Sequence, residues 1–79
     1  MTQETLLPLV ETRKGKYRHY KNLQYEVLGT VRHSETLEPM TLYRAMYGDQ
    51  GLWVRPATMF NETLLIGEVQ TKRFTWISD

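Results

Sequence analysis

One stretch of the chain decides the fold that we expect: Leu23-Gln24-Tyr25-Glu26-Val27-Leu28-Gly29-Thr30-Val31. Apolar side chains recur at every second position, at Leu23, Tyr25 and Val27, and the series resumes at Val31. A spacing of two predicts a β-strand with one buried face. Gly29 has no side chain where the pattern requires one, so it predicts a bulge or a sharp bend in this strand.

Further strand-like segments lie on both sides of this stretch. Upstream, residues 15–21 form a short aromatic and basic segment. Downstream, residues 33–40 have the polar, proline-containing composition of a loop, and strand formers follow in residues 41–47 and 52–55. The intervening Gly-Asp-Gln-Gly at 48–51 supplies the glycines that a tight turn needs. The pattern therefore predicts a hairpin centred on Asp49 and Gln50.

The last third of the chain continues the pattern of short elements. Pro56 suits the start of a helix, and residues 56–61 are long enough for a single helical or 3₁₀ turn. Residues 62–66 and 73–77 are two more short strand-like pieces, which we expect to be joined through Gly67.

Together these segments predict a mainly β fold, a small single-domain barrel of about five short strands with one helical or 3₁₀ turn near the C-terminal part. Closing a sheet removes its exposed edges, which a chain of 79 residues cannot cover with helices. We expect the barrel to span residues 15–79, after an N-terminal tail or short helix at residues 1–14. Without cysteine, such a small core depends on aromatic packing or on oligomerisation.

A series of motifs appears in order along the chain: Gly15-Lys16-Tyr17-Arg18-His19-Tyr20-Lys21, Arg32-His33-Ser34-Glu35-Thr36, Tyr43-Arg44-Ala45-Met46-Tyr47-Gly48, Gly51-Leu52-Trp53-Val54-Arg55-Pro56, Met59-Phe60 and Arg73-Phe74. The series resembles a bacterial family of small uncharacterised proteins, domain-of-unknown-function family 1653. The resemblance covers about residues 15–77 and implies a compact SH3-like β-barrel, but it implies no function. One departure lies at residues 68–73, where the family pattern has a proline before the arginine.

Charge is unevenly distributed along the chain, although the formal net charge is only +1. Residues 13–33 contain six Lys or Arg side chains against one Glu, a net charge of +5. Such asymmetry favours either an anionic partner or a solvated strand face.

Within this basic segment, aromatic and basic side chains alternate over Lys16, Tyr17, Arg18, Tyr20 and Lys21. This arrangement is typical of single-stranded nucleic-acid binding, in which aromatic rings stack on bases and cations contact phosphates. The alternative is that the tyrosines are buried and the cations are solvated. The small net charge is below the strongly basic footprint of most nucleic-acid binders.

The preferred candidate site lies on the expected hairpin. Trp53 and Arg55 share one face of their strand, whereas Leu52 and Val54 share the other, which we expect to face the core. A surface that combines an indole with a guanidinium suits a small anionic or peptidic ligand. The alternative is that Trp53 closes one end of the barrel and Arg55 covers it with its aliphatic stem. The candidate contacts are Trp53, Arg55, Arg44, Tyr43, His33 and Ser34.

Catalysis and metal binding have little support in the sequence. His33, Ser34 and Glu35 are the most reactive-looking string, but adjacent side chains on an extended segment point in different directions. A loop stabilised by hydroxyl-to-backbone hydrogen bonds explains this string better. Zinc normally takes four ligands, and the chain offers two histidines and no cysteine. We therefore expect no catalytic residue, no metal and no cofactor.

The chain contains no cysteine, which is typical of cytoplasmic proteins. It also has no apolar run that is long enough for a signal peptide or a membrane span. We expect a cytoplasmic, non-enzymatic binding module with no membrane contact. Two alternatives remain open, namely single-stranded nucleic-acid binding through residues 13–33 and a structural or self-associating role as a homodimer. The small core makes self-association reasonable.

Overall fold

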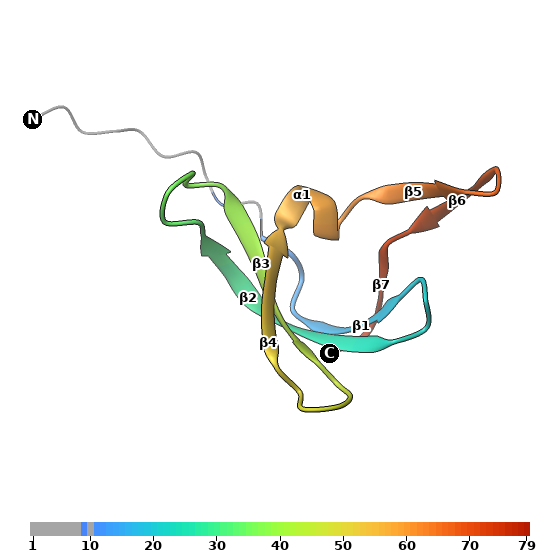
Figure 1. The fold of residues 1–79 in the computed structure, drawn as a ribbon, viewed down its shortest axis with the longest axis horizontal. Coiled ribbons are helices and arrows are strands. Elements are labelled where there is room, and N and C mark those ends of the chain that lie inside the picture. The colour runs from blue at the N-terminus through green and yellow to red at the C-terminus, as the bar shows by residue number, and fades with distance from the viewer. Residues whose placement is uncertain (1–8, 10) are drawn as a thin grey trace, which may run out of the picture.

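The computed structural model describes residues 9 and 11–79 (Figure 1). Within these residues the chain forms seven β-strands and one helical turn: β1 (Gly15–His19), β2 (Gln24–Arg32), β3 (Pro39–Ala45), β4 (Leu52–Pro56), α1 (Ala57–Phe60), β5 (Thr63–Ile66), β6 (Val69–Lys72) and β7 (Phe74–Ser78). Most of the expected tail or short helix at residues 1–14 lies outside the described residues. In the described part, no helix has the length and apolar character needed to span a membrane.

The predicted mainly β, single-domain fold is confirmed. Five strands form one antiparallel sheet in the order β4-β3-β2-β1-β7, and β5 pairs with β6 in a separate hairpin that projects from it (Figure 1). The predicted helical turn is α1, and the predicted hairpin is β3–β4.

The expected piece at residues 62–66 is β5, but through Gly67 it is joined to the unexpected strand β6 and not to the piece at residues 73–77. Gly67 and Glu68 both have positive φ, 52° and 68°, at the point where the chain reverses. Two consecutive residues with positive φ form the tightest hairpin turn, so residues 69–72 run back along β5 before the last strand begins. Glycine is the usual residue in such a turn, so the glutamate at its second position did not indicate a turn in the sequence.

The predicted irregularity at Gly29 is confirmed as a bulge. In the β2–β3 ladder Val27 is opposite Tyr43, whereas Gly29 is opposite Leu42, so one residue of β2 is left without a partner. A bulge bends its strand and strengthens the local twist. The sheet accordingly curls, and the side chains of Val27 and Tyr43 lie on its concave face.

The core fills this concave face with aromatic rings. Phe60 of α1 stacks on Phe74 of β7 with ring centroids 3.9 Å apart and an interplanar angle of 6°. Tyr17, Val27 and Tyr43 complete the buried cluster. Because no hydrogen-bonded ladder joins β4 to β7 in the described residues, aromatic packing between α1 and β7 spans the open side of the sheet.

The expectation that Leu52 and Val54 face the core is wrong, since their exposed fractions are 62% and 51%. In the β3–β4 ladder, Val54 is opposite Leu42 and Trp53 is opposite buried Tyr43. The concave side is therefore the face of Trp53, and Leu52 and Val54 lie on the convex side.

Gly15 makes the closest backbone approach in the sheet. Its φ is 130°, and a Cβ at this position would lie 2.5 Å from the carbonyl oxygen of Ser78 and 2.8 Å from Nε1 of Trp76. The same indole donates a hydrogen bond to the carbonyl of Lys14 at 3.3 Å and stacks with Arg13, whose Cζ lies 3.5 Å from the ring centroid. Gly15 therefore allows β7 to pack tightly against the start of β1.

We expect Gly15→Ala to lower the free energy of unfolding by about 1–3 kcal/mol, because the methyl group must displace backbone in an unfavourable conformation. Gly29→Ala is the matched control, since no atom lies within 4 Å of the point that an added Cβ would occupy and its φ is ordinary. The control should change stability by less than about 0.5 kcal/mol. Urea denaturation followed by circular dichroism measures both, and equal losses would contradict the role of close packing at Gly15.

Candidate functional site

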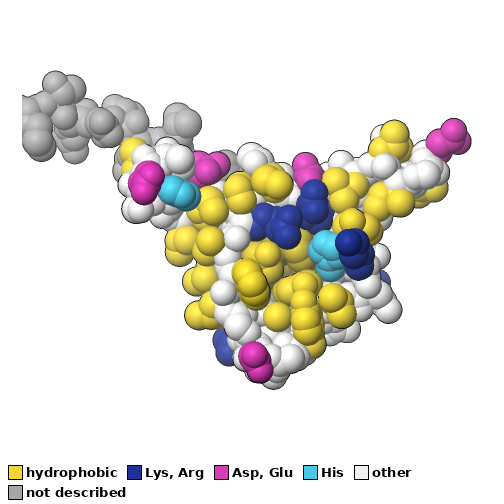
Figure 2. All heavy atoms as spheres, viewed as in Figure 1, with side chains coloured by type: hydrophobic (Ala, Val, Ile, Leu, Met, Phe, Trp, Pro, Cys, Tyr) yellow, Lys and Arg dark blue, Asp and Glu magenta, His cyan; other side chains and the backbone are white. Residues whose placement is uncertain are grey.

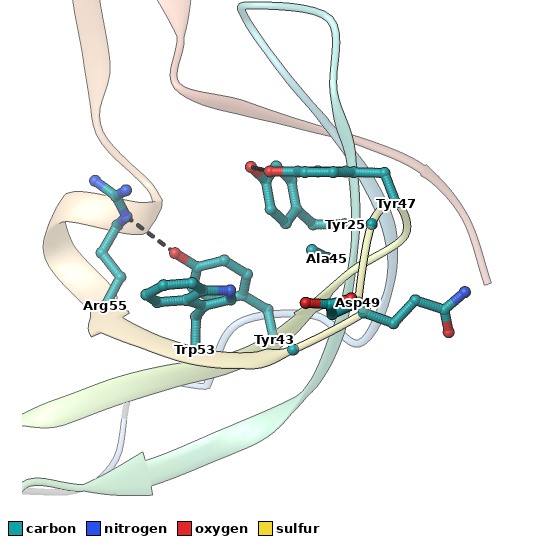
Figure 3. A pocket seen from close by; sticks show the side chains of 10 residues that line it. Tyr25, Tyr43, Ala45, Tyr47, Asp49, Trp53 and Arg55 are labelled. Atoms are coloured by element: carbon teal, nitrogen blue, oxygen red, sulfur yellow. Dashed lines mark hydrogen bonds between the residues drawn. The ribbon is translucent and has the colours of Figure 1, made fainter.

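A pocket of about 450 Å³ opens on the concave face beside the β3–β4 loop. Its side chains come from β2, β3, β4 and that loop, as Figure 3 shows. The side chains that the following argument uses are Tyr25, Tyr43, Tyr47, Asp49, Trp53 and Arg55.

Trp53 is the most exposed aromatic side chain of this pocket, with an exposed fraction of 60%. It is opposite Tyr43 in the ladder, yet the Tyr43 ring is only 6% exposed. The difference arises because β4 is an edge strand, so the indole has a neighbouring strand on one side only. The alternative in which Trp53 closes the barrel is therefore wrong, and the indole forms a wall of the pocket.

Arg55 lies on the same face of β4, two residues from Trp53. Its Nε donates a long hydrogen bond, 3.5 Å, to the hydroxyl oxygen of Tyr43, and its Cζ lies 5.8 Å from the ring centroid of Phe74. Among the described residues, no carboxylate lies within ion-pair distance of this guanidinium. Arg55 is thus a half-buried cation at the pocket whose charge these residues leave unpaired.

A pair of tyrosines forms the wall on the other side of the pocket (Figure 3). The hydroxyl groups of Tyr25 and Tyr47 share a hydrogen bond of 2.5 Å, and their rings meet edge to face with centroids 5.5 Å apart. Burial, followed by the hydrogen bond to Tyr47, raises the pKa of Tyr25 to about 12. Tyr25 is therefore uncharged near neutral pH, and the pair adds an aromatic surface with a polar rim.

Three of the expected contact residues do not reach this pocket. Arg44 lies on the convex face, where its Nε is 3.9 Å from a carboxylate oxygen of Glu26. His33 and Ser34 lie in the β2–β3 loop, at the opposite end of β3 from the pocket. The expected site is corrected accordingly: neighbouring positions on a strand alternate between faces, so Arg55 and Tyr43 share the concave side but Arg44 does not.

The reactive-looking string around His33 is a structured loop. Nδ1 of His33 accepts hydrogen bonds from the backbone N–H groups of Glu35 at 3.0 Å and Thr36 at 3.2 Å. Of the hydroxyl-to-backbone hydrogen bonds expected in this loop, the structure shows the one in which Thr36 Oγ1 accepts from the backbone N–H of Glu38 at 3.3 Å. Among residues 9 and 11–79, no three His, Asp or Glu side chains gather where they could hold a metal ion.

The basic segment of residues 13–33 divides between two faces of the sheet. Tyr17 is 6% exposed, and its hydroxyl donates to the carbonyl of Arg13 at 2.7 Å, so its ring is not available for stacking. Lys16 and Arg18 flank Tyr17 on β1 and therefore lie on the convex side. Tyr20 and Lys21 lie beyond the end of β1, with the Lys21 ammonium 5.8 Å from the Tyr20 ring centroid. The expected platform is corrected to two separate groups.

Sequence reasoning missed His19 and Tyr25 as neighbours of the site. Tyr25 and His19 both follow the spacing of two on their strands and lie on the concave side, with ring centroids 6.3 Å apart. The same spacing groups Tyr47 with Tyr43 and Ala45 in the expected strand at residues 41–47, and the structure brings Tyr47 to the pocket although β3 ends at Ala45.

The comparisons with known proteins agree with the resemblance. A family model described as "Protein of unknown function (DUF1653)" matches residues 15–76. The chain belongs to the DUF1653 family. A crystal structure of a DUF1653 protein from Bordetella bronchiseptica is similar to it, with a TM-score of 0.77 and 35% sequence identity, over 85% of this chain and 88% of that chain. No match was found among curated proteins.

The range matched by the DUF1653 model includes every strand of the pocket. It begins at the first residue of β1 and ends within β7. The pocket therefore lies within the part of the chain that the DUF1653 model matches.

His19 gives the stability of the domain a specific pH dependence. Burial lowers the pKa of His19 below its ordinary value of 6.5, and the positive charges of Arg55, Arg73 and Lys21 lower it further. Because the unfolded chain then binds a proton more readily than the folded one, stability decreases as the pH falls below about 6.5.

We expect the free energy of unfolding to decrease between about pH 7 and pH 5, and His19→Gln to reduce this decrease. Urea denaturation at several pH values measures both proteins. An identical pH dependence in wild type and His19→Gln would contradict the assignment.

Proposed function

We propose that this protein is a non-catalytic binding module that recognises a small anionic or peptidic ligand on its concave face, with Trp53 and Arg55 as the principal contacts. The observation that carries the proposal is the Arg55 guanidinium, which has no carboxylate partner among the described residues and lies beside an exposed indole at an open pocket. A ligand carboxylate or phosphate would supply the missing partner.

The physical chemistry of the pocket supports recognition by stacking and charge. Binding sites are typically concave and mainly apolar, with a few polar groups that orient the ligand. Trp, Tyr and Arg provide most of the binding energy at protein interfaces, because they combine large contact areas with directional hydrogen bonds. Trp53 and the Tyr25–Tyr47 pair offer flat walls, and Arg55 offers planar, bidentate donors for an oxyanion. Asp49 adds an acceptor at the rim, where the backbone N–H of a peptide would fit.

The nucleic-acid alternative has little support from the positions of these side chains. It requires exposed aromatic rings next to cations along one path, whereas Tyr17 is buried and the cations of β1 lie on the convex face.

Self-association is the second candidate function, because the first three residues of edge strand β4 carry neither a charge nor a proline. Leu52, Trp53 and Val54 are consecutive, exposed and apolar on edge strand β4. Natural edge strands normally carry charges, prolines or bulges that prevent pairing. A homodimer formed by antiparallel pairing of two β4 strands would bury these side chains, and light scattering would detect it as a doubled mass.

We also propose that the protein is bacterial and cytoplasmic and that its curled sheet is a variant of the SH3-like barrel. The relative from Bordetella bronchiseptica and the cysteine-free sequence support the first two assignments. The strongly bent sheet with a helical turn after β4 supports the third.

A small aromatic anion tests the binding proposal. Benzoate should shift the NMR signals of the Trp53 indole N–H and the Arg55 Nε–H, and neutral benzamide, which has the same shape, should bind at least about fivefold more weakly. Arg55→Gln should weaken benzoate binding about tenfold or more, which corresponds to loss of a charge-assisted hydrogen bond. Arg44→Gln is the matched control, since this arginine lies one strand away on the other face. Equal effects of the two substitutions would exclude the proposed contact.

A stability measurement separates binding from folding. Because the Trp53 side chain is mainly exposed, Trp53→Ala should cost less than about 1 kcal/mol while abolishing the benzoate response. Phe60→Ala removes a ring that is 1% exposed and should cost about 3–5 kcal/mol. If Trp53→Ala unfolds the domain, the indole is structural and the proposal fails.

A further inference from the structure

A group of basic side chains lies on the concave face next to the pocket. We define the basic cluster as His19, Lys21, Arg55 and Arg73, which come from β1, the turn after it, β4 and the residue before β7. Figure 2 shows Lys, Arg and His side chains close together in the middle of this face, surrounded by hydrophobic side chains. The three segments that carry them, at residues 19–21, 55 and 73, are far apart in the sequence, so only the fold brings these segments together.

The Phe74 ring holds two members of the basic cluster in place. The His19 imidazole meets it edge to face at 4.9 Å between centroids, and the Cζ of Arg55 lies 5.8 Å from its centroid. Nδ1 of His19 accepts a hydrogen bond from the backbone N–H of Lys21 at 3.1 Å. The neutral imidazole therefore carries its proton on Nε2, which can donate to a ligand in either protonation state. The proton taken up on charging goes to Nδ1, which then no longer accepts from Lys21.

The charges around His19 are only partly balanced. Glu62 forms an ion pair with Arg73, through both Nε and Nη2 of the guanidinium. Arg55 and Lys21 have no ion-pair partner among the described residues. The remaining neighbours from β2 and β3 are the side chains of Tyr25 and Tyr43. The surplus is therefore two positive charges, which become three when His19 is protonated.

We propose that the basic cluster binds the dianionic group of an aromatic or heteroaromatic phosphate ester, whose ring occupies the pocket between Trp53 and the Tyr25–Tyr47 pair, and that His19 takes up a proton on binding. The inference rests on the proposed function and names the ligand class of that site. Arg55 belongs to both the pocket and the basic cluster, so it connects the ring site to the phosphate site.

A dianion fits this arrangement better than a carboxylate does. A single negative charge satisfies Arg55 alone and leaves the repulsion between Lys21 and protonated His19 in place. Two negative charges on a tetrahedral group accept the planar donors of Arg55 together with the N–H of His19. The lowered pKa of His19 shows how strongly burial and the neighbouring cations oppose its protonation, and a bound dianion reverses the contribution of the cations.

Inorganic sulfate tests the phosphate site without the ring, because its double charge does not change between pH 5 and pH 8. In NMR titrations, sulfate should raise the pKa of His19 by about half a unit or more, and its affinity should increase about threefold or more from pH 7.5 to pH 5.5. The His33 imidazole is an internal control in the same sample and should not respond. Equal responses of the two histidines, or no response of His19, would overturn the proposal.

Three aromatic probes then test the ligand class at pH 7. Phenyl phosphate should bind at least about tenfold more tightly than phenyl sulfate, which has a similar shape but one negative charge. If benzoate binds at Trp53 and phenyl phosphate shows no such advantage, the phosphate site is refuted and the proposed function stands. If none of the probes shifts the Trp53 indole signal, the proposed function fails as well.

Adenosine 5′-monophosphate distinguishes two kinds of ligand that combine an aromatic ring with a phosphate group. If it binds more tightly than phenyl phosphate, the site is assigned to nucleotides. If it binds more weakly, the site is assigned to ligands whose phosphate is attached directly to the aromatic ring.

A matched pair of lysines tests the position of the site. Lys21→Gln should weaken phenyl phosphate binding about threefold to tenfold, because it removes one of the two surplus charges. Lys16→Gln also removes one positive charge, but from the convex face of β1, and should have little effect on binding. Both positions are on the surface, so both variants should fold. Equal weakening would show that the phosphate responds to net charge alone and would overturn the assignment.

Discussion

The stack of Phe60 on Phe74 is the interaction on which the rest of this structure depends. It joins α1 to β7 across the side of the curled sheet that has no hydrogen-bonded ladder. Tyr17 meets Phe60 edge to face at 5.2 Å, and Tyr43 lies beside both phenylalanines, with ring centroids 5.4 Å and 5.8 Å away. In a domain this small, a few large rings replace the disulfides that many short chains need.

The same stack also positions the candidate site. The edges of Phe74 that Phe60 does not cover contact His19, Tyr25 and Arg55, so the core and the basic cluster share one ring. The pocket is thereby attached to the most buried part of the molecule, although its own outer wall, Trp53, is exposed. A rigid support under exposed, adaptable contacts is the arrangement expected of a binding surface.

Local patterns in the sequence predicted most of the elements. The spacing of two predicted β2, the missing side chain at Gly29 predicted the bulge, and Pro56 predicted the helical turn. Strand β6 was missed because the turn that leads into it depends on a positive φ at Glu68, which residue preferences do not reveal. For the site, the pairing of Trp53 with Arg55 could be predicted from their spacing, whereas the approach of His19 and Arg73 could not.

The sequence alone determined which side chains share a face of each strand, because alternation is a local property of extended backbone. It could not determine which of the two faces would be concave, and for β4 the expected choice of Leu52 and Val54 as the core face was wrong. That choice depends on the direction in which the whole sheet curls, which follows from the β2 bulge and from the packing of α1 on β7. Only the tertiary structure therefore decided that Trp53 and Arg55 line a pocket and that basic residues from separate segments meet beside it.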